Sequence, residues 1–595
     1  MNSTACLFVS IGIFICGIFC SFLFGGARKK SKYFLNTINI LAVSTFLSSV
    51  VMFFPIYHEI FLSDQLRGIK VFLLSIHNSI RLFIVDGEFT IVLDYLANVN
   101  EPIANVNEPI ATVYSVFAAV IFVMAPVLTF GVVLSFFKNI SAYSRYFLGF
   151  FKSVCIFSEL NQKSLALAES IKHNDKRRLI IFTDVFENNE ETVYELIQKA
   201  RETGAVCFKK DIVNINFRFH YKRGKLSFFI IGNDESENMD QTLKLISAYK
   251  NRDNTDLFVF SSSADSELLL ASSDKGLVKV RRINDIRSLV NRILYDNGMT
   301  IFESAYPKGE DKQISAVVVG LGQFGTCMVK ALSWFCQMDG YKIRIDAFDQ
   351  DKKAKIKFAA QCPELMSPEY NGKIIPGDAY YEINIHSGLN VDTSAFAEYI
   401  RRLGRTTYVF VALGNDEINI KTAAYLRMLF ERMGCKPVIQ AVVFNEAKKE
   451  ALNGIRNYRG QSYDLDFIGD LKTSYSEEVI INSELEKVAL ERHLSYGAKE
   501  EDFWKYEYNY RSSIASAIHK KMKILCKMPG IEKVLEDRSD DELWALRKLE
   551  HRRWNAYMRS EGYCKAPQRN DLAKTHHCLV PFDELSDEDR KKDDD

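Results

Sequence analysis

The feature that most constrains this chain is a change of hydropathy near residue 138. Before that point lie three apolar runs without a charged residue, at 6–24, 38–57 and 112–137. A run of about 20 apolar residues is long enough to cross the hydrocarbon layer of a membrane as a helix. We therefore expect a transmembrane region at 1–137, with a loop at 58–111 between its second and third helices, followed by soluble domains.

The charges around these runs indicate their orientation. The first run could be a signal peptide, but no basic residue precedes it, and a basic cluster follows it instead. That cluster consists of Arg28, Lys29, Lys30 and Lys32. Because positive residues favour the cytoplasmic side, the loop after the first helix should be cytoplasmic. The N-terminus and the loop at 58–111 would then lie outside, and everything after the third helix would lie in the cytoplasm.

Composition argues against several function classes. The net charge is +1, so the whole chain lacks the basic field of a nucleic-acid-binding protein, and no nucleic-acid partner is expected. The 12 cysteines form no Cys-x-x-Cys pair, which fits reduced thiols. One group could suggest zinc, but its spacing matches no standard finger, and we predict no metal site. That group is Cys564, His576, His577 and Cys578.

After a connector at 138–151, β-rich runs alternate with helical segments, which is typical of a parallel sheet. Two Rossmann-like domains are expected, at 152–300 and 312–490. In the first, the strand at 154–157 leads into Ser158-Glu159-Leu160-Asn161. This turn lacks the glycines that let a pyrophosphate approach the backbone, and Glu159 would repel one. We expect the first domain to be a degenerate scaffold.

The second domain carries an intact glycine fingerprint after its first expected strand, at 316–319. The fingerprint residues are Gly320, Leu321, Gly322, Gln323, Phe324 and Gly325. Asp349 follows the next expected strand, where an acid can accept hydrogen bonds from ribose hydroxyls. This pattern predicts a bound nucleotide held by Gly320, Gly322, Gln323, Phe324, Gly325 and Asp349. The alternative is a Rossmann-shaped regulatory domain whose cleft stays empty.

A repeated motif links the two domains. Gly-Asn-Asp-Glu follows an apolar strand at Gly232 and again at Gly414, which indicates an internal duplication. With Gly377-Asp378, both domains resemble the RCK/KTN domains that regulate potassium channels and transporters. The resemblance covers about residues 150–480. It implies binding of NAD(H), ATP or ADP with Asp378 among the site residues, assembly into a homo-oligomer (dimer or tetramer), and coupling to a membrane pore.

Residues 500–595 are aromatic and charged, with helical spacing. They contain Glu550-His551-Arg552-Arg553-Trp554, then Gly562-Tyr563, then Leu579-Val580-Pro581-Phe582. These motifs, in this order, resemble the bacterial form of the ryanodine-receptor (RyR) repeat domain. That resemblance implies a small helical module that recognises a nucleotide-like ligand or a protein, in bacterial signalling or anti-phage defence. The bacterial inner membrane is then the expected location.

An arginine and a tryptophan around one pocket suit a flat anionic ligand, such as a nucleotide second messenger. The candidates in this module are Trp504, Arg511, Glu550, His551, Arg553 and Trp554. In the alternative interpretation, Trp554 and His551 build the small core and Arg553 pairs with Glu550. The charged residues at 587–595 are expected to form a solvated end.

Together these patterns predict a membrane α-helical segment plus two Rossmann-like parallel-sheet α/β domains and a small, mostly helical C-terminal module. The first functional hypothesis is a nucleotide-regulated membrane protein, either a ligand-gated channel or a membrane-disrupting effector of anti-phage defence. Its partners would be the lipid bilayer and a nucleotide. The alternative is a membrane-anchored nucleotide-binding scaffold that recruits a partner. Hydrolysis of an NAD-type nucleotide is a third hypothesis, although no set of catalytic residues is recognisable.

Overall fold

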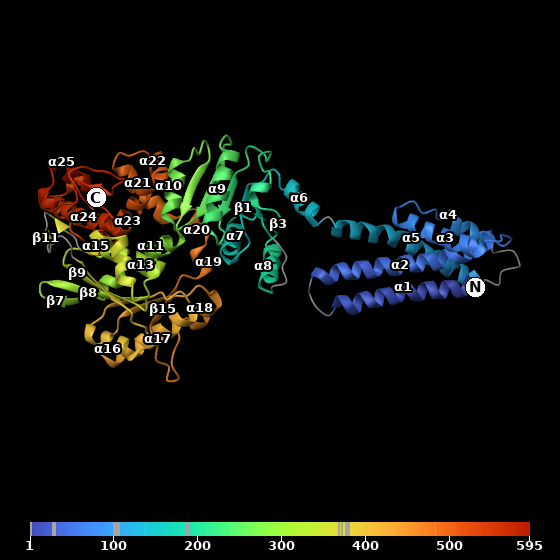
Figure 1. Cartoon of the computed structure of the whole chain (residues 1–595), viewed down its shortest axis with the longest axis horizontal. Helices are drawn as coiled ribbons and strands as arrows, with labels where there is room; N and C mark the ends of the chain where they lie inside the picture. Colours follow the sequence, from blue (N-terminus) through green and yellow to red (C-terminus); the bar gives the residue numbers. More distant parts are fainter. Residues whose placement is uncertain are drawn as a thin grey trace. The chain divides into compact units, whose positions relative to one another are not determined.

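The computed structural model divides into two compact units, Met1–Leu148 and Gly149–Asp595; their helices and strands are labelled in Figure 1. It describes residues 3–26, 31–98, 108–136, 138–185, 191–366, 369–370, 373–374, 381–481 and 483–594. Two sets of residues named above lie outside this part of the chain. They are the basic residues Arg28, Lys29 and Lys30, and the Gly377-Asp378 pair.

The N-terminal unit is helical. Its elements are α1 (Ser3–Gly26), α2 (Ser31–Ile60), α3 (Arg67–Phe83), α4 (Thr90–Asn98), α5 (Glu108–Phe136) and α6 (Lys138–Leu148). Within the described residues, α1, α2 and α5 each hold a window long and apolar enough to cross a membrane, with mean hydropathy between 2.0 and 2.3. The three expected spans are therefore confirmed as helices, and their length and composition suggest membrane association.

Small polar residues hold α1 against α2. The Ser10 hydroxyl donates to the carbonyl of Ser48 at 2.7 Å, and the Ser48 hydroxyl donates to the carbonyl of Ser10 at 2.8 Å. About two turns further along α1, Gly17 lies against the side chain of Ser44. Small residues let two membrane helices approach closely, so this contact fixes how the pair packs.

Replacing Gly17 with leucine should disrupt this packing. A Cβ atom at Gly17 would lie 2.1 Å from the Ser44 hydroxyl oxygen, whereas a Cβ at Gly12 of the same helix meets nothing within 4 Å. We expect Gly17→Leu to destabilise the detergent-purified protein by about 1–3 kcal/mol in thermal unfolding, as overpacking generally does. Gly12→Leu is the matched control. Equal melting temperatures for the two variants would contradict the α1–α2 contact.

The second unit begins with a six-stranded parallel sheet. Its strands are β1 (Val154–Phe157), β2 (Leu179–Phe182), β3 (Val206–Cys207), β4 (Leu226–Ile230), β5 (Thr255–Phe260) and β6 (Lys279–Ile283). They follow the order β3-β2-β1-β4-β5-β6. The connecting helices are α7 (Gln162–Asn174), α8 (Glu191–Glu202), α9 (Glu235–Tyr249), α10 (Ala264–Ser272) and α11 (Asp285–Asn297). Every residue of β1 and β4 is buried, as expected of strands covered on both faces.

A second sheet follows the short helix α12 (Met299–Glu303). Its strands are β7 (Tyr306–Lys308), β8 (Asp311–Val319), β9 (Tyr341–Asp349), β12 (Tyr381–Ser387), β13 (Tyr408–Val411), β14 (Val438–Val442) and β15 (Leu465–Ile468). The order is β12-β9-β8-β13-β14-β15, all parallel, and β7 pairs antiparallel with β8. Apart from β7, this is the strand order of the first sheet, and it is the doubly wound Rossmann order.

Helices and short strands complete the second domain. The helices are α13 (Gln323–Phe335), α14 (Ala354–Gln361), α15 (Pro363–Met366), α16 (Ser394–Leu403), α17 (Asp416–Arg432) and α18 (Glu446–Leu452). The short strands β10 (Glu369–Tyr370) and β11 (Lys373–Ile374) form an antiparallel pair. The chain thus contains two parallel-sheet α/β domains, as the sequence predicts.

The two domains also share a hydrogen-bonding device. Asn238 in α9 accepts from the backbone N–H of Gly232 and donates to the carbonyl of Phe260, at the end of β5. Asn419 in α17 accepts from the N–H of Leu413 and donates to the carbonyl of Val442, at the end of β14. In both domains an asparagine ties a strand end to the next strand. This shared contact supports the internal duplication.

The last part of the second unit is mainly helical. Its helices are α19 (Leu471–Ser474), α20 (Glu477–Ile480), α21 (Glu484–Ser495), α22 (Glu500–Lys505), α23 (Glu507–Leu525), α24 (Asp540–Ser560) and α25 (Asp587–Arg590), with a two-stranded pair of β16 (Cys564–Lys565) and β17 (Thr575–His576). The ring of Tyr557 in α24 meets that of Trp334 in α13 edge-on, 6.2 Å between centroids. One apolar core therefore joins this region to the second sheet.

Candidate functional site

The glycine fingerprint forms the turn between β8 and α13, and two of its glycines are required by the backbone. Gly320 has a φ of +92°, and a Cβ there would lie 2.4 Å from the carbonyl oxygen of Ala412. A Cβ at Gly325 would lie 1.7 Å from the carbonyl oxygen of Gly320. No side chain fits at either position without a shift of the backbone. These two glycines give the turn its shape.

Gly322 differs, because the space around it is open. A Cβ built there meets nothing within 4 Å, and the residue is exposed. It is the N-cap of α13, and no side chain caps this helix end. Uncapped N–H groups at a helix start favour an anion. Gln323 is also exposed, and Phe324 packs against Phe444 with 5.6 Å between ring centroids. The turn therefore presents free backbone donors to an open surface.

Asp349 lies directly beside this turn, at the end of the neighbouring strand β9. One carboxylate oxygen accepts from the N–H of Leu321 at 2.7 Å, and the other accepts from the N–H of Asp351 at 2.7 Å. The carboxylate thus holds the turn in place. Each oxygen keeps a second lone pair, which could accept from a ribose hydroxyl. The structure brings together all the predicted fingerprint residues except Asp378, which lies outside the described residues.

The matching turn of the first domain is filled by its own side chains. The Glu159 carboxylate accepts from the backbone N–H of Asn233 at 3.1 Å and from its side-chain amide at 3.3 Å. Asn161 caps α7 by accepting from the N–H of Ser164 at 2.9 Å. These groups use donors that a bound phosphate would need. The geometry fits the expected scaffold role of this domain.

The six predicted residues of the C-terminal region do not gather around one cavity. Glu550 and Arg553 pair in the interior, each only 2% exposed. The Arg553 guanidinium donates to one Glu550 oxygen at 2.9 and 3.0 Å, and the Lys523 ammonium donates to the other at 2.7 Å. Burial alone would raise the pKa of Glu550, but the cations of Arg553 and Lys523 hold it well below its usual range. This is the internal pairing that the alternative interpretation describes.

His551 and Trp554 occupy another face of α24. The His551 ring stacks on Trp554 with centroids 5.8 Å apart and donates through Nε2 to the carbonyl of Val580 at 2.9 Å. Its Nδ1 lies 3.1 Å from the carboxylate of Asp593, and the adjacent Asp594 pairs with Arg547. The expectation of a solvated end was therefore wrong for these two acids, because the His551 ring and the partly buried Arg547 guanidinium of α24 contact them.

Arg511 and Trp504 lie on the side of this region that contacts the first sheet. The Arg511 guanidinium is 3.0 Å from Glu267 of α10 and 3.4 Å from Glu561. Burial alone would lower the pKa of Arg511, but the carboxylates of Glu561, Glu507 and Glu267 raise it. Trp504 stacks on the guanidinium of Arg281, 4.8 Å from the ring centroid. These two predicted residues therefore belong to an interdomain contact.

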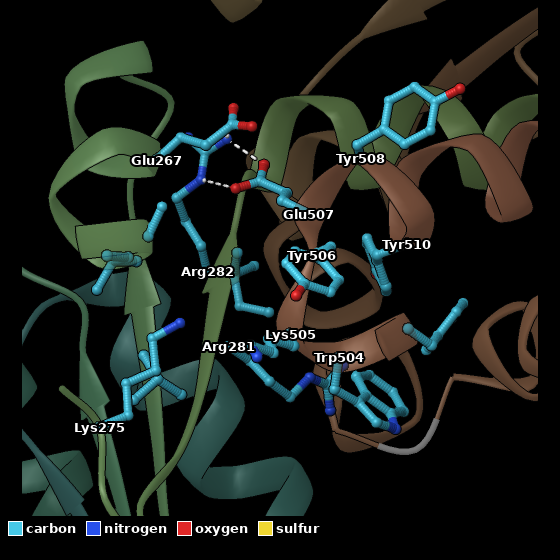
Figure 2. Close-up of a pocket in the computed structure, with 15 residues that line it drawn as sticks. Glu267, Lys275, Arg281, Arg282, Trp504, Lys505, Tyr506, Glu507, Tyr508 and Tyr510 are labelled. Carbon is cyan, nitrogen blue, oxygen red and sulfur yellow. Dashed lines mark hydrogen bonds and ion pairs between the residues drawn. The ribbon is translucent and has the colours of Figure 1, made fainter. Parts of the chain in front are cut away.

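A cavity of about 210 Å³ lies at this contact, beside Trp504 (Figure 2). Its other wall comes from β6 and the loop before it and carries Lys275, Arg281 and Arg282. Sequence reasoning missed these three basic residues. The chain separates Arg282 from its partner Glu507 by 225 positions, and no local pattern connects them. The aromatic run at 503–510 was the one signal that pointed to this place.

One group in the described residues could hold a metal ion. The ligand atoms of His576, His577 and Cys578 lie within 4.8 Å of one another, and Cys564 is not part of the group. The Nδ1 atom of His576 already accepts from the backbone N–H of Cys578 at 3.1 Å. Burial lowers the pKa of His576 to about 4 and raises that of the Cys578 thiol to about 11. Three close side chains, one with a nitrogen already occupied, are fewer than the four ligands that structural zinc takes.

No protein-family model matches this chain, and no curated protein matches it. A Rossmann sheet hosts many unrelated functions, so the fold alone does not identify one. The functional interpretation therefore depends on the geometry of the glycine turn, on the interdomain cavity, and on the membrane helices that share the polypeptide.

Removing the buried arginine should destabilise the protein strongly. Arg553→Ala leaves the enclosed Glu550 carboxylate short of a cation, which costs about 3–5 kcal/mol in comparable buried pairs. Arg569→Ala is the control, because its pair with Asp571 is exposed and such pairs contribute about 0–1 kcal/mol. Denaturant unfolding of the full-length protein, followed by tryptophan fluorescence, measures both. A loss for Arg553→Ala no larger than the control would contradict the internal pairing.

The Glu561 carboxylate should make stability depend on pH. Burial alone would raise its pKa, but Arg287 and Arg511 lower it from 4.5 to about 2. A depressed pKa stabilises the fold above pH 4.5, and this contribution, on the order of 3 kcal/mol, is lost as the pH falls towards 2. Glu561→Gln should flatten this part of the pH profile of thermal unfolding. The exposed Glu536→Gln is the control, and identical profiles for all three proteins would refute the assignment.

Proposed function

We propose that this protein is a nucleotide-regulated membrane protein, acting as a ligand-gated channel or as a membrane-disrupting effector. The observation that carries the proposal is the open glycine turn at Gly322, with Asp349 beside it, on a polypeptide that also carries three helices able to span a membrane. The cofactor would be a nucleotide of the NAD(H), ATP or ADP class.

The position of the turn supports a phosphate-binding role. In open α/β sheets, ligands bind outside the carboxyl ends of the strands where the strand order reverses. β8 lies between β9 and β13, so the turn after β8 stands at that reversal. A phosphate there would accept from the uncapped N–H groups of α13, and Asp349 would meet the ribose.

The resemblances noted in the sequence extend the proposal. Two Rossmann domains in tandem are the arrangement of RCK/KTN regulators, which assemble as dimers or rings on membrane proteins. The C-terminal helical region would be the RyR-type module. By the same analogy, the protein would form a homo-oligomer in the bacterial inner membrane, with its N-terminus outside and its α/β domains in the cytoplasm, and would serve in anti-phage defence.

The alternative is a membrane-anchored scaffold that binds the nucleotide and recruits a partner without forming a pore. Both hypotheses place the nucleotide at the glycine turn. They differ in the role of the membrane helices, which only anchor the scaffold but form or disrupt a membrane passage in the first hypothesis. An enzyme acting on NAD-type nucleotides is less well supported. Asp416, an acid near the second sheet, accepts from the backbone N–H groups of Phe444 and Asn445, and such a role is structural.

Gly322→Asp should abolish nucleotide binding while the fold survives. A carboxylate at this position would repel a phosphate, yet aspartate is a favourable N-cap residue and should stabilise α13. Calorimetric titration of the full-length protein in detergent with NAD⁺, NADH, ATP and ADP tests this. We expect the wild type to bind at least one of them, and the variant to lose at least about tenfold in affinity.

The matched control is Asn161→Asp. Asn161 is the N-cap of α7 and occupies the corresponding turn of the first domain. If that domain is a scaffold, the added charge there should leave affinity unchanged. Unaltered binding by a folded Gly322→Asp variant would exclude the glycine turn as the site. Loss of binding in Asn161→Asp alone would move the site to the first domain.

A further inference from the structure

The cavity at the interdomain contact has two chemically distinct walls. One wall belongs to α22 and the start of α23, and the other to α10, β6 and the loop between them. Figure 2 shows Lys275, Arg281 and Arg282 facing Trp504, Tyr506 and Tyr510 across it. Both walls lie in the same compact unit, Gly149–Asp595. The cavity therefore lies where the first domain and the C-terminal helices meet within one unit.

Aromatic rings dominate the wall from α22 and α23. Trp504 is held on edge by Phe503, with centroids 4.7 Å apart at 87°, and lies 6.2 Å from Tyr510. Tyr506 is 48% exposed, so its ring is available at the mouth of the cavity. Within the described residues the indole N–H of Trp504 donates to no protein acceptor. Arg281 lies over one face of Trp504, so a flat ring could stack on the other face or on Tyr506.

The wall from the first domain supplies positive charge that is not fully neutralised. Arg281 pairs with Glu486, and Arg282 pairs with Glu507 and Glu267, two acids that also line the cavity. The Lys275 ammonium has no ion-pair or hydrogen-bond partner in the described part of the chain; burial, the leading cause, lowers its pKa, and the Glu507 carboxylate raises it. Lys505 lies 5.2 Å from the ring centroid of Tyr506 and forms no ion pair among the same residues. Two ammonium groups are thus left for an outside anion.

We propose that this cavity binds one nucleotide unit, with its base on Trp504 and Tyr506 and its phosphate on Lys275 and Lys505. The cavity volume, about 210 Å³, is below the range of roughly 300–1,000 Å³ that holds drug-sized ligands. A single base with one phosphate suits this space better than a dinucleotide. This site is separate from the glycine turn, so the inference goes beyond the proposed function.

Occupancy of this cavity would couple two parts of the soluble unit. The base would lie on α22 and α23, and the phosphate would meet the loop before β6. The bidentate pair between Arg282 and Glu507 already bridges the same two elements. A ligand that binds both walls stabilises the arrangement in which the walls are in contact. The stabilisation equals the difference between the ligand's binding free energies for that arrangement and for one in which the walls are apart. The first domain is also the one joined directly in sequence to α6.

Calorimetric titration of the full-length protein with AMP, GMP, CMP and UMP, each alone, tests the proposal. We expect at least one to bind, and Lys275→Met to weaken that binding about tenfold by removing a phosphate contact. Adenosine and the other unphosphorylated nucleosides should bind weakly and equally to wild type and Lys275→Met. Lys279→Met is the matched control, since Lys279 is an exposed residue of β6 that does not line the cavity.

The base contact is tested with Trp504→Leu, which should also weaken binding, and with Trp504→Phe, which keeps a ring and should retain most of it. Gly322→Asp should leave binding of the monophosphate intact, which separates this site from the glycine turn. The proposal is overturned if none of the four monophosphates binds the folded wild type. It is equally overturned if Lys275→Met binds as well as Lys279→Met, or if Gly322→Asp alone abolishes the binding.

Discussion

The unit Gly149–Asp595 depends on glutamates from its C-terminal region that pair with arginines of the first α/β domain. These pairs are Glu477–Arg178, Glu486–Arg281, Glu507–Arg282 and Glu561–Arg287. All four acids are largely buried, and an unpaired buried charge costs several kcal/mol. The C-terminal region and the first domain must therefore form together. Because the second domain lies between them in sequence and shares a core with α23 and α24, the same pairs connect all three parts.

This construction places both proposed ligand sites on connected elements. The glycine turn opens α13, and α13 packs on α24 through Trp334 and Tyr557. The interdomain cavity lies at the start of α23, which packs in the same core. A nucleotide at either site can shift the equilibrium between two conformations of the unit only to the extent that it binds one of them more tightly than the other. Two sites on one core give a physical route by which a metabolite and a second messenger could be sensed together.

The sequence predicts the elements with a local signal. Hydropathy locates the membrane helices. The alternation of β-rich runs with helical segments predicts the parallel sheets, and the glycine fingerprint predicts the turn at Gly322. Contacts between distant residues have no such signal, so Lys275 across the cavity from Trp504 and Asp593 beside His551 could not be predicted. The repeated Gly-Asn-Asp-Glu shows another limit. By letters Asp234 matches Asp416, yet the helix caps are Asp234 and Asn415. The residue that caps the helix is decided by where the helix begins, and that start is shifted by one residue between the two copies of the motif.

In the proposed function, a nucleotide on the unit Gly149–Asp595 changes the state of the membrane helices. Release of a trapped ion or dye from liposomes that contain the full-length protein measures this most directly, with the nucleotide that calorimetry shows to bind. We expect release that rises with nucleotide occupancy and that, without nucleotide, stays near the background of empty liposomes. Equal release with and without nucleotide, from correctly inserted protein that binds it, would contradict the claim and favour the anchored scaffold.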